Sequence, residues 1–351
     1  MGQRNTRREF LKAASVAVAG TTLPSRSEAG PPQKILNHNP KMSYRPLGKT
    51  GFMISEIALG GHGAVKTGDP VQNRAAVLER AVELGMNYVD NNIDAECDLY
   101  GKAMAASRSA GRDKWFIGFA SWPEKITEEY EAQLTPAKMM QSIEDRLRSY
   151  RTDMLDMWRP VGATWGEGQR NIATLLMVSH KALDMVVEVF GKAKQQGKVR
   201  FLGVSAHNPK VFHRVLEEYP QFHVIIFPYL FLTTEFGGDS LLQLAEEKGV
   251  GVIGLKPFGA GTTFGVRPRE IAGQVDQRAH VLLREMLREK RVSAVIPGVN
   301  FPEQLEENVK GSYEKESART AEDDRALLSC RKNFYAHLTP EYQWLRQWET
   351  V

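Results

Sequence analysis

Short apolar runs alternate with longer amphipathic segments along most of the chain. The apolar runs are three to six residues long and rich in Val, Ile, Leu and Phe. Runs of this kind are typical of strands buried inside a parallel sheet. The pattern predicts eight strands, over residues 54–59, 87–90, 115–119, 154–158, 200–204, 224–227, 252–255 and 294–296.

The segments between these runs have helical periodicity. Residues 73–84 place apolar side chains on one stripe, and Gly85 follows, at the position where glycine commonly ends a helix. Strands that alternate with helices predict parallel βα units, and eight units predict an α/β fold of the (β/α)8 TIM barrel type. No Gly-x-Gly-x-x-Gly follows the first strand, which argues against a Rossmann domain. Two more helices are predicted over residues 183–196 and 241–248, before Gly197 and Gly249.

The barrel is expected to span residues 43–310, beginning with a small hairpin over residues 43–54. Residues 30–42 are rich in Pro and Asn and are interpreted as a linker. Residues 311–351 form a C-terminal helical extension in which residues 314–333 are charged and helical. Its last part places Trp344, Leu345 and Trp348 on one face of a short helix. This face packs on the barrel wall, covers the pocket or makes a dimer contact.

The N-terminus has the features of an export signal. Residues 6–12 are Thr-Arg-Arg-Glu-Phe-Leu-Lys, a weakly apolar run follows over 13–23, and small residues precede a cleavage position after Ala29. This pattern is typical of a twin-arginine signal peptide over residues 1–29, and a disordered basic tail is the alternative. The signal implies the twin-arginine export machinery as a partner and the periplasm or exterior of a bacterium as the location.

Composition narrows the class of protein. The 351 residues are 42% hydrophobic, enough for a large core, and no run of about 18 apolar residues predicts an integral membrane segment. The net charge is +4, of which residues 1–29 contribute +3. The remaining residues, 30–351, are therefore nearly neutral, which predicts no nucleic-acid partner. A small-molecule substrate is the expected partner. Cys97 and Cys330 are too few for a disulfide framework or a metal cluster.

Three motifs resemble the aldo-keto reductase family in order and spacing. They are Tyr-Arg-Pro-Leu-Gly-Lys-Thr-Gly at 44–51, Gly-Lys-Val-Arg-Phe-Leu-Gly-Val-Ser at 197–205, and Val-Ile-Pro-Gly at 295–298. The resemblance covers residues 43–310. It implies hydride transfer between NADP or NAD and a carbonyl or alcohol group.

The family uses an Asp, a Tyr, a Lys and a His for this chemistry. The matching positions are occupied by Asp90, Tyr100, Ala120 and Val161, so the Lys and the His are replaced. Loss of such groups lowers acid–base catalysis by a factor on the order of 10²–10⁴. The segment between Asp90 and Tyr100 is longer than in the family and is expected to form a loop over residues 91–99.

Asp90 needs a new partner once the Lys is absent, because an unpaired buried carboxylate is costly. We favour Arg159, which follows the fourth strand; Asn91, Asn92, Lys256 or a neutral carboxyl group are the alternatives. Two histidines stand at strand ends and titrate near neutral pH, although a solvated or structural role is common for such residues. No ligand spacing predicts a metal site. The candidate catalytic residues are Tyr100, Asp90, His207, His62 and Arg159.

The resemblance also implies a set of cofactor-binding residues. Ser205 would orient the nicotinamide amide, Lys256 would meet the pyrophosphate, and Leu255 stands where the family has a stacking Tyr. The implied set is Ser205, Lys256, Pro257, Gly259, Gly298, Gln304 and Asn308. Three tryptophans are predicted near the same face, and they either stack on a sugar-like substrate or pack in the barrel wall: Trp122, Trp158 and Trp165. Two functions remain: an exported oxidoreductase acting on a carbonyl or alcohol, and a ligand-binding or non-redox barrel that has lost hydride transfer.

Overall fold

The strands of the chain form a nearly closed barrel. The computed structural model describes residues 35–60, 68–122, 134–160, 179–206, 209–233, 239–266 and 274–340. In this part of the chain, eight parallel strands lie in the order of the sequence, and bridges from Ile57 to Val295 and from Gly60 to Gly298 join the first strand to the last. The predicted TIM barrel is therefore confirmed. The strands are β3 (Leu59–Gly60), β4 (Tyr88–Asn91), β5 (Phe116–Ser121), β6 (Leu155–Pro160), β7 (Val199–Ser205), β8 (Val224–Pro228), β9 (Gly251–Leu255) and β10 (Ala294–Ile296).

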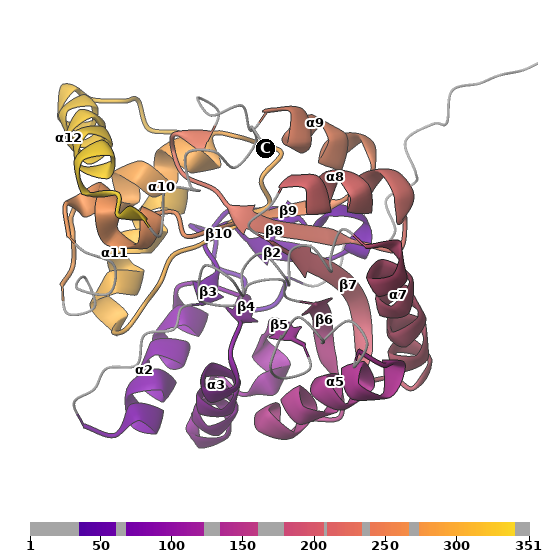
Figure 1. Cartoon of the computed structure of the whole chain (residues 1–351). Helices are drawn as coiled ribbons and strands as arrows, with labels where there is room; N and C mark the ends of the chain where they lie inside the picture. Colours follow the sequence, from indigo (N-terminus) through magenta and orange to yellow (C-terminus); the bar gives the residue numbers. More distant parts are fainter. Residues whose placement is uncertain are drawn as a thin grey trace, which may run out of the picture. The chain divides into compact units, whose positions relative to one another are not determined.

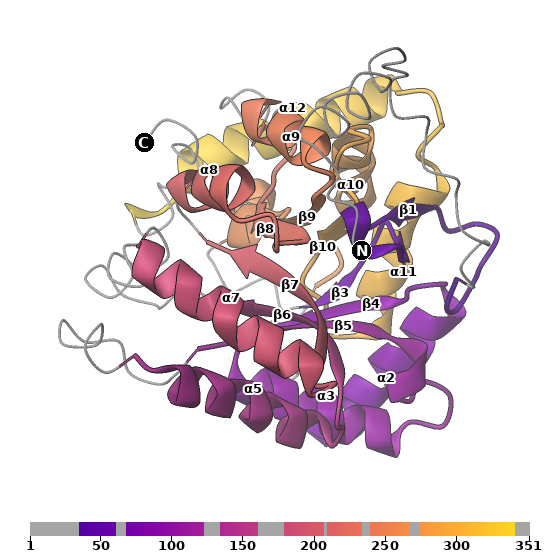
Figure 2. The ribbon, with the colours of Figure 1, turned by 90° about the vertical axis from the view of Figure 1, so that its right-hand side faces the viewer.

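Helices surround the strands, as Figure 1 and the turned view in Figure 2 show. Consecutive helices α2, α3, α5 and α7 pack side by side, and α12 lies against α10 and the segment after β9. The helices are α2 (Pro70–Glu83), α3 (Asp94–Ala106), α5 (Pro136–Tyr150), α7 (His180–Gln195), α8 (Pro209–Glu218), α9 (Asp239–Glu247), α10 (Ala279–Leu287), α11 (Pro302–Tyr313) and α12 (Ala321–His337), with 3-10 turns η1 (Gly48–Thr50), η2 (Arg112–Lys114) and η4 (Gly259–Phe264). None of the described helices is long and apolar enough to cross a membrane.

Alternation along the strands separates an inner from an outer apolar cluster. Tyr88 faces the barrel interior, whereas Val89 faces the helices, because successive strand residues point to opposite sides. The inner cluster fills the barrel, as is usual for this fold. Its buried members are Leu47, Ile54, Ala58, Tyr88, Phe116, Met157, Val224, Ile226, Ile253, Ala294 and Ile296.

A hairpin closes the end of the barrel where the strands begin. β1 (Tyr44–Pro46) and β2 (Met53–Ser55) pair antiparallel around η1, as predicted. Gly48 has φ +48°, and a Cβ there would lie 2.8 Å from the Gly249 oxygen, so this turn requires glycine. The first predicted strand, 54–59, was wrong in part: its start belongs to the hairpin, and only Leu59–Gly60 enters the barrel.

The predicted helix ends are confirmed where glycine follows the helix. Gly85, Gly197 and Gly249 all have positive φ just after α2, α7 and α9. The expected loop over residues 91–99 was wrong, because α3 already begins at Asp94. Glu96 explains this start: its carboxylate accepts the backbone N–H of Asn92 (2.9 Å), and an acidic group in the first turn stabilises a helix.

The described part of the C-terminal extension covers residues 311–340, and its main element is α12. The predicted helix over residues 314–333 was wrong in its start, because α12 begins at Ala321 and ends at His337. Thr320 and Asp323 form a reciprocal capping box at its start, which satisfies two backbone N–H groups. Asp323, Leu327, Cys330 and Phe334 form the buried stripe of the helix, at the spacing expected of an amphipathic helix. The expected helix with Trp344, Leu345 and Trp348 lies outside the described residues.

Candidate functional site

Three inward-facing side chains meet where the parallel strands end. Asp90 on β4, Arg159 on β6 and Ser205 on β7 are 6%, 3% and 5% exposed. Arg159 Nε donates to Asp90 Oδ2 (3.2 Å), its Nη2 donates to Asp90 Oδ1, and its Nη1 donates to Ser205 Oγ (2.6 Å). We call Asp90, Arg159 and Ser205 the mouth network. It lies at the end of the barrel where enzymes of this fold carry their active sites.

The guanidinium of Arg159 is fully used by its neighbours. Besides the contacts with Asp90 and Ser205, Nη1 points at Asn92 Oδ1 (3.4 Å) and Nη2 at the Asn91 carbonyl (3.3 Å). An arginine has five N–H donors, and each of them now faces an acceptor. Arg159 is therefore a fixed cation that joins β4, β6 and β7.

Tyr88 supports the network from the layer below. Its hydroxyl donates to Asp90 Oδ2 (2.7 Å), and it is completely buried. Gly118 on β5 makes room for this pair, since a Cβ there would lie 2.7 Å from Asp90 Oδ2 and closer still to the Tyr88 hydroxyl. The sequence analysis missed both residues. The signal for Tyr88 was its position two residues before Asp90, which places both side chains on one face of a strand.

Burial and charge act in opposite directions on this pair. Burial raises the pKa of Asp90, and the Arg159 guanidinium opposes that rise. Burial alone would lower the pKa of Arg159, but the Asp90 carboxylate outweighs it and the pKa is raised. Arg159 accordingly stays charged at any working pH. The expectation that Arg159 replaces the missing partner of Asp90 is confirmed as a contact.

Tyr100 belongs to a different group of side chains. It lies in α3, is completely buried, and its hydroxyl accepts from Arg74 Nη1 (3.1 Å), which also donates to the Val299 carbonyl (3.0 Å). Burial raises the pKa of Tyr100 to about 12, although the Arg74 charge lowers it. Its neighbours are in the outer layer between the wall and the helices. The Tyr100 hydroxyl also bonds the side chain of Asn91, next to Asp90 on β4. In the described part of the chain, no direct hydrogen bond joins Tyr100 to Asp90.

The expected cofactor-binding residues end β7, follow β9 and β10, or lie on α11. Lys256, with φ +54°, and the buried Pro257 follow β9, and Gly259 begins η4. Gly298 follows β10 and is exposed, and a Cβ at this position would meet nothing within 4 Å. Gln304 binds the Asn300 N–H (2.8 Å) and the Gln274 carbonyl (2.7 Å). Asn308 is buried on α11.

A nicotinamide dinucleotide fits these residues. Ser205 Oγ accepts from Arg159, so its own proton is left to donate. The open space at Gly298 allows close approach of a ligand to the backbone. Ser205 would hold the amide, and the segment after β9 would hold the pyrophosphate.

The sequence matches a family model described as the Aldo/keto reductase family over residues 56–281, more than half of the chain. The chain belongs to this family. It is 24% identical over 330 residues to an L-galactose dehydrogenase of Arabidopsis thaliana, covering 84% of this chain and 96% of that protein. It is 22% identical over 326 residues to an L-glyceraldehyde 3-phosphate reductase of Escherichia coli, covering 77% and 87%.

Solved structures of aldo-keto reductases share the fold. The holo form of an aldo-keto reductase from Bacillus halodurans superposes with a TM-score of 0.57 at 20% identity, covering 86% of this chain and 99% of that one. Ala120 on β5 is buried. It pairs in register with Arg159 on β6, whose guanidinium is the cation beside Asp90.

Some expected site residues fall outside the described part of this aldo-keto reductase. His62, His207, Val161 and Trp165 are among them. Trp158 is described and is a wall residue: it is completely buried, and its indole N–H donates to Ser121 Oγ (2.9 Å). The sugar-stacking role considered for Trp158 was wrong for this reason.

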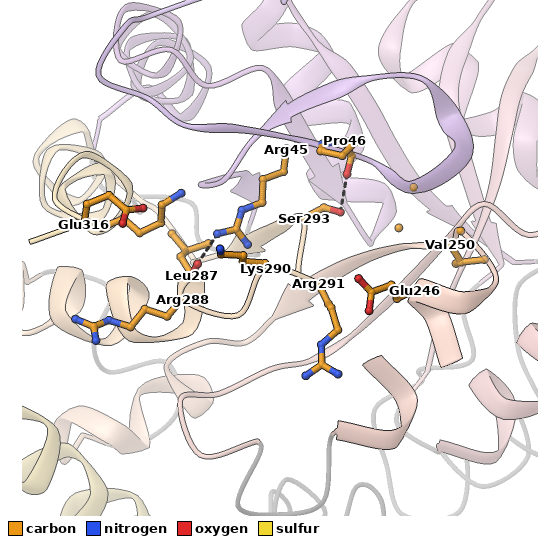
Figure 3. Close-up of a pocket in the computed structure, with 14 residues that line it drawn as sticks. Arg45, Pro46, Glu246, Val250, Leu287, Arg288, Lys290, Arg291, Ser293 and Glu316 are labelled. Carbon is orange, nitrogen blue, oxygen red and sulfur yellow. Dashed lines mark hydrogen bonds between the residues drawn. The ribbon is translucent and has the colours of Figure 1, made fainter. Parts of the chain in front are cut away.

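The pocket drawn in Figure 3 lies at the other end of the barrel. Its volume is about 630 Å³, and it opens beside the hairpin and the first residues of β9 and β10. Arg45 is anchored there by the carbonyls of Glu289 and Val292 (2.6 Å each) and by Glu56 (2.5 Å). In TIM barrels this end serves stability rather than catalysis. The candidate site is therefore the mouth network and not this pocket.

Proposed function

We propose that this aldo-keto reductase is an exported oxidoreductase with a modified catalytic site. It transfers hydride between a nicotinamide cofactor, NADP or NAD, and a carbonyl or alcohol group of a small, sugar-like substrate. The observation that carries the proposal is the mouth network. The charge that the family's Lys would provide beside Asp90 is provided by Arg159, and Ser205 is held by the same guanidinium.

The network acts mainly by orientation. Arg159 fixes the Ser205 oxygen as an acceptor, so the Ser205 proton would be left to bind the carboxamide of a nicotinamide cofactor. The bound cofactor supplies or accepts the hydride. Fixed dipoles and charges in a buried site stabilise charge that develops during the reaction without having to reorganise.

A proton must accompany the hydride when a carbonyl becomes an alcohol. We assign this proton to a histidine that follows a strand in the sequence, either His207 or His62. Histidine titrates near neutral pH, which suits a general acid. Arg159 is unsuitable because it stays protonated, and the Tyr100 hydroxyl is bound to Arg74 in the outer layer.

Two observations support a sugar-like substrate. Two of the relatives are a dehydrogenase of L-galactose and a reductase of L-glyceraldehyde 3-phosphate. Trp122 directly follows β5 and packs, half-buried, against the outer apolar cluster; its indole nitrogen has no hydrogen-bond partner among the described residues. An aromatic face with a donor at its edge suits a polyhydroxylated ring.

Nucleotide binding tests the proposal directly. Tryptophan emission is followed while NADPH, and separately NADH, is titrated to about 100 μM, within the ordinary range of substrate concentrations for enzymes. Quenching with energy transfer to the dihydronicotinamide supports the proposal, and Ser205→Ala should weaken it. Absence of any signal with both nucleotides would instead favour a barrel that has lost hydride transfer.

Export requires its own experiment. Residues 1–29 are fused to a reporter that becomes active only when exported in folded form, and the Arg7→Lys/Arg8→Lys variant is the control. Periplasmic activity that disappears in the double variant supports the twin-arginine signal. Equal cytoplasmic retention of both fusions would refute export without affecting the proposed chemistry.

A further inference from the structure

The segment that follows β9 is bent in an unusual way. Between residues 256 and 265, five residues have positive φ: Lys256 (+54°), Gly259 (+53°), Ala260 (+58°), Gly261 (+100°) and Gly265 (+80°). Lys256 and Ala260 have side chains, for which this conformation is strained. Strained backbone persists only when the surrounding structure holds it, and it concentrates at ligand sites.

The C-terminal helix α12 supplies the surroundings that hold this segment. Phe334 is completely buried in a cluster with Leu230, Leu232 and Leu338, and Ala260 packs against that cluster. The ring of Phe334 is so close to Gly259 that a Cβ there would lie 3.3 Å from it.

Polar contacts add a second set of restraints. Asn333 Nδ2 donates to the Thr263 carbonyl (3.4 Å). Arg278 joins both sides, since Nη1 donates to Ser329 Oγ on α12 and Nη2 to the Phe264 carbonyl, each at 3.3 Å. Apolar and polar contacts therefore connect α12 to the whole of η4.

We propose that α12 is a positioning element that keeps residues 256–265 in the shape required to bind the pyrophosphate of the cofactor. Phe334 is its central positioning residue, although it does not face the nucleotide. This inference rests on the proposed function. The segment lies directly after a strand end at the mouth, where Lys256 at its start would meet the pyrophosphate. Its turns are closed by the N–H groups of Gly259, Gly261 and Gly265, which donate to carbonyls within the segment.

A preformed loop has a predictable effect on binding. A loop that is already ordered loses less entropy when the ligand binds, so the complex is tighter and dissociates more slowly. Slow dissociation would suit an exported enzyme, because a folded protein then carries its cofactor with it. The contact between α12 and residues 256–265 therefore slows the dissociation of the cofactor.

The experiment compares Phe334→Ala with Leu328→Ala in the full-length protein. Leu328 lies on the same helix but is 53% exposed, so this variant removes apolar bulk without disturbing η4. Amide hydrogen exchange of residues 259–265 is measured without nucleotide, and NADPH dissociation is measured by stopped-flow fluorescence. Circular dichroism tests whether each variant is folded. If Phe334→Ala does not fold, Phe334→Leu takes its place in both measurements.

We expect Phe334→Ala to accelerate both exchange and dissociation by about tenfold, with Leu328→Ala within about twofold of the wild type. Unchanged exchange in folded Phe334→Ala would overturn the proposal. Unchanged NADPH dissociation from a wild-type-like complex would also overturn it while leaving the proposed function intact. A wild-type protein that binds neither NADPH nor NADH would refute the proposed function itself.

Discussion

Ala120 on β5 and Arg159 on β6 are partners in the register of the barrel wall, and only Arg159 carries a charge. The cation beside Asp90 therefore comes from β6 and not from β5. A guanidinium can bind both oxygens of a carboxylate and still reach other acceptors, as Arg159 does with Ser205. Unlike a titratable ammonium, this guanidinium is a permanent cation.

Removing Arg159 should expose the cost of an unpaired Asp90. We expect Arg159→Met to lower the free energy of unfolding by about 3–5 kcal/mol, because a buried carboxylate loses its partner. Urea denaturation measures the change. Arg151→Met is the control: it removes an exposed arginine that lies 3.9 Å from Asp98, and its effect should stay within about 0.5 kcal/mol. A loss below about 1 kcal/mol in Arg159→Met would show that Asp90 is not charged in the folded protein.

A lysine at position 120 should rescue part of that loss. In the Arg159→Met background, we expect Ala120→Lys to restore about 1–2 kcal/mol, whereas in the wild type it should destabilise by adding a second cation and overfilling a buried site. A double-mutant cycle in urea measures this coupling. Additive effects of the two substitutions would refute the idea that both positions serve the same carboxylate.

The order of the strands and helices could be predicted from the sequence. Buried strands appear as short apolar runs, and helix ends are marked by a following glycine. Gly85 marks the end of α2 whatever surrounds it. The partner of Asp90 was also predictable, since a buried carboxylate requires a cation and Arg159 stood at a neighbouring strand end. These inferences depend on periodicity and charge, which short stretches of sequence contain.

The location of Tyr100 was not predictable from the same signals. The family pattern placed a loop over residues 91–99 just before Tyr100. Acidic residues in the first turn of α3 stabilise a helix there instead, and this helix includes Tyr100. Whether Tyr100 then faces the barrel mouth or the outer layer depends on how α3 packs against β4. This packing is a tertiary contact, which a short stretch of sequence does not reveal. The role of α12 was hidden likewise, because the contact between Phe334 and Gly259 joins residues far apart in the chain.

Gly118 should tolerate no side chain. We expect Gly118→Ala to destabilise the protein by about 1–3 kcal/mol, because the new methyl group would overlap the Tyr88 hydroxyl and Asp90. Thermal or urea denaturation measures the loss, and Tyr88→Phe should relieve part of it. Gly298→Ala is the matched control, since a Cβ there meets nothing. Equal stability of the Gly118→Ala variant and the wild type would contradict the close packing around Asp90.

Tyr100→Phe should affect stability and not cofactor binding. Loss of the hydroxyl removes an acceptor from Arg74, so we expect a destabilisation of about 1–3 kcal/mol. Titration with NADPH should give an unchanged dissociation constant. A variant of normal stability but greatly reduced turnover would restore Tyr100 as a catalytic residue.

His223 should make the folded protein sensitive to mild acid. Burial, followed by the charges of Lys49 and Lys194, lowers its pKa to about 4, and its Nδ1 accepts the backbone N–H of Leu202 (3.3 Å). An unfolded histidine titrates near pH ~6.5, so above that pH the residue is neutral in both states and has no effect on the pH dependence. As the pH falls from about 6.5 to 4, only the unfolded state gains a proton, and the folded state loses stability.

After allowance for solvent screening, we expect this loss to be about 2 kcal/mol, with no further contribution from His223 below pH 4. Urea denaturation at a series of pH values measures it. His223→Gln should flatten the curve between pH 6.5 and 4, because glutamine cannot take up the proton. His337→Gln removes an exposed imidazole at the end of α12 and tests whether loss of any histidine has the same effect. Parallel curves for wild type and His223→Gln would show that another group controls acid stability.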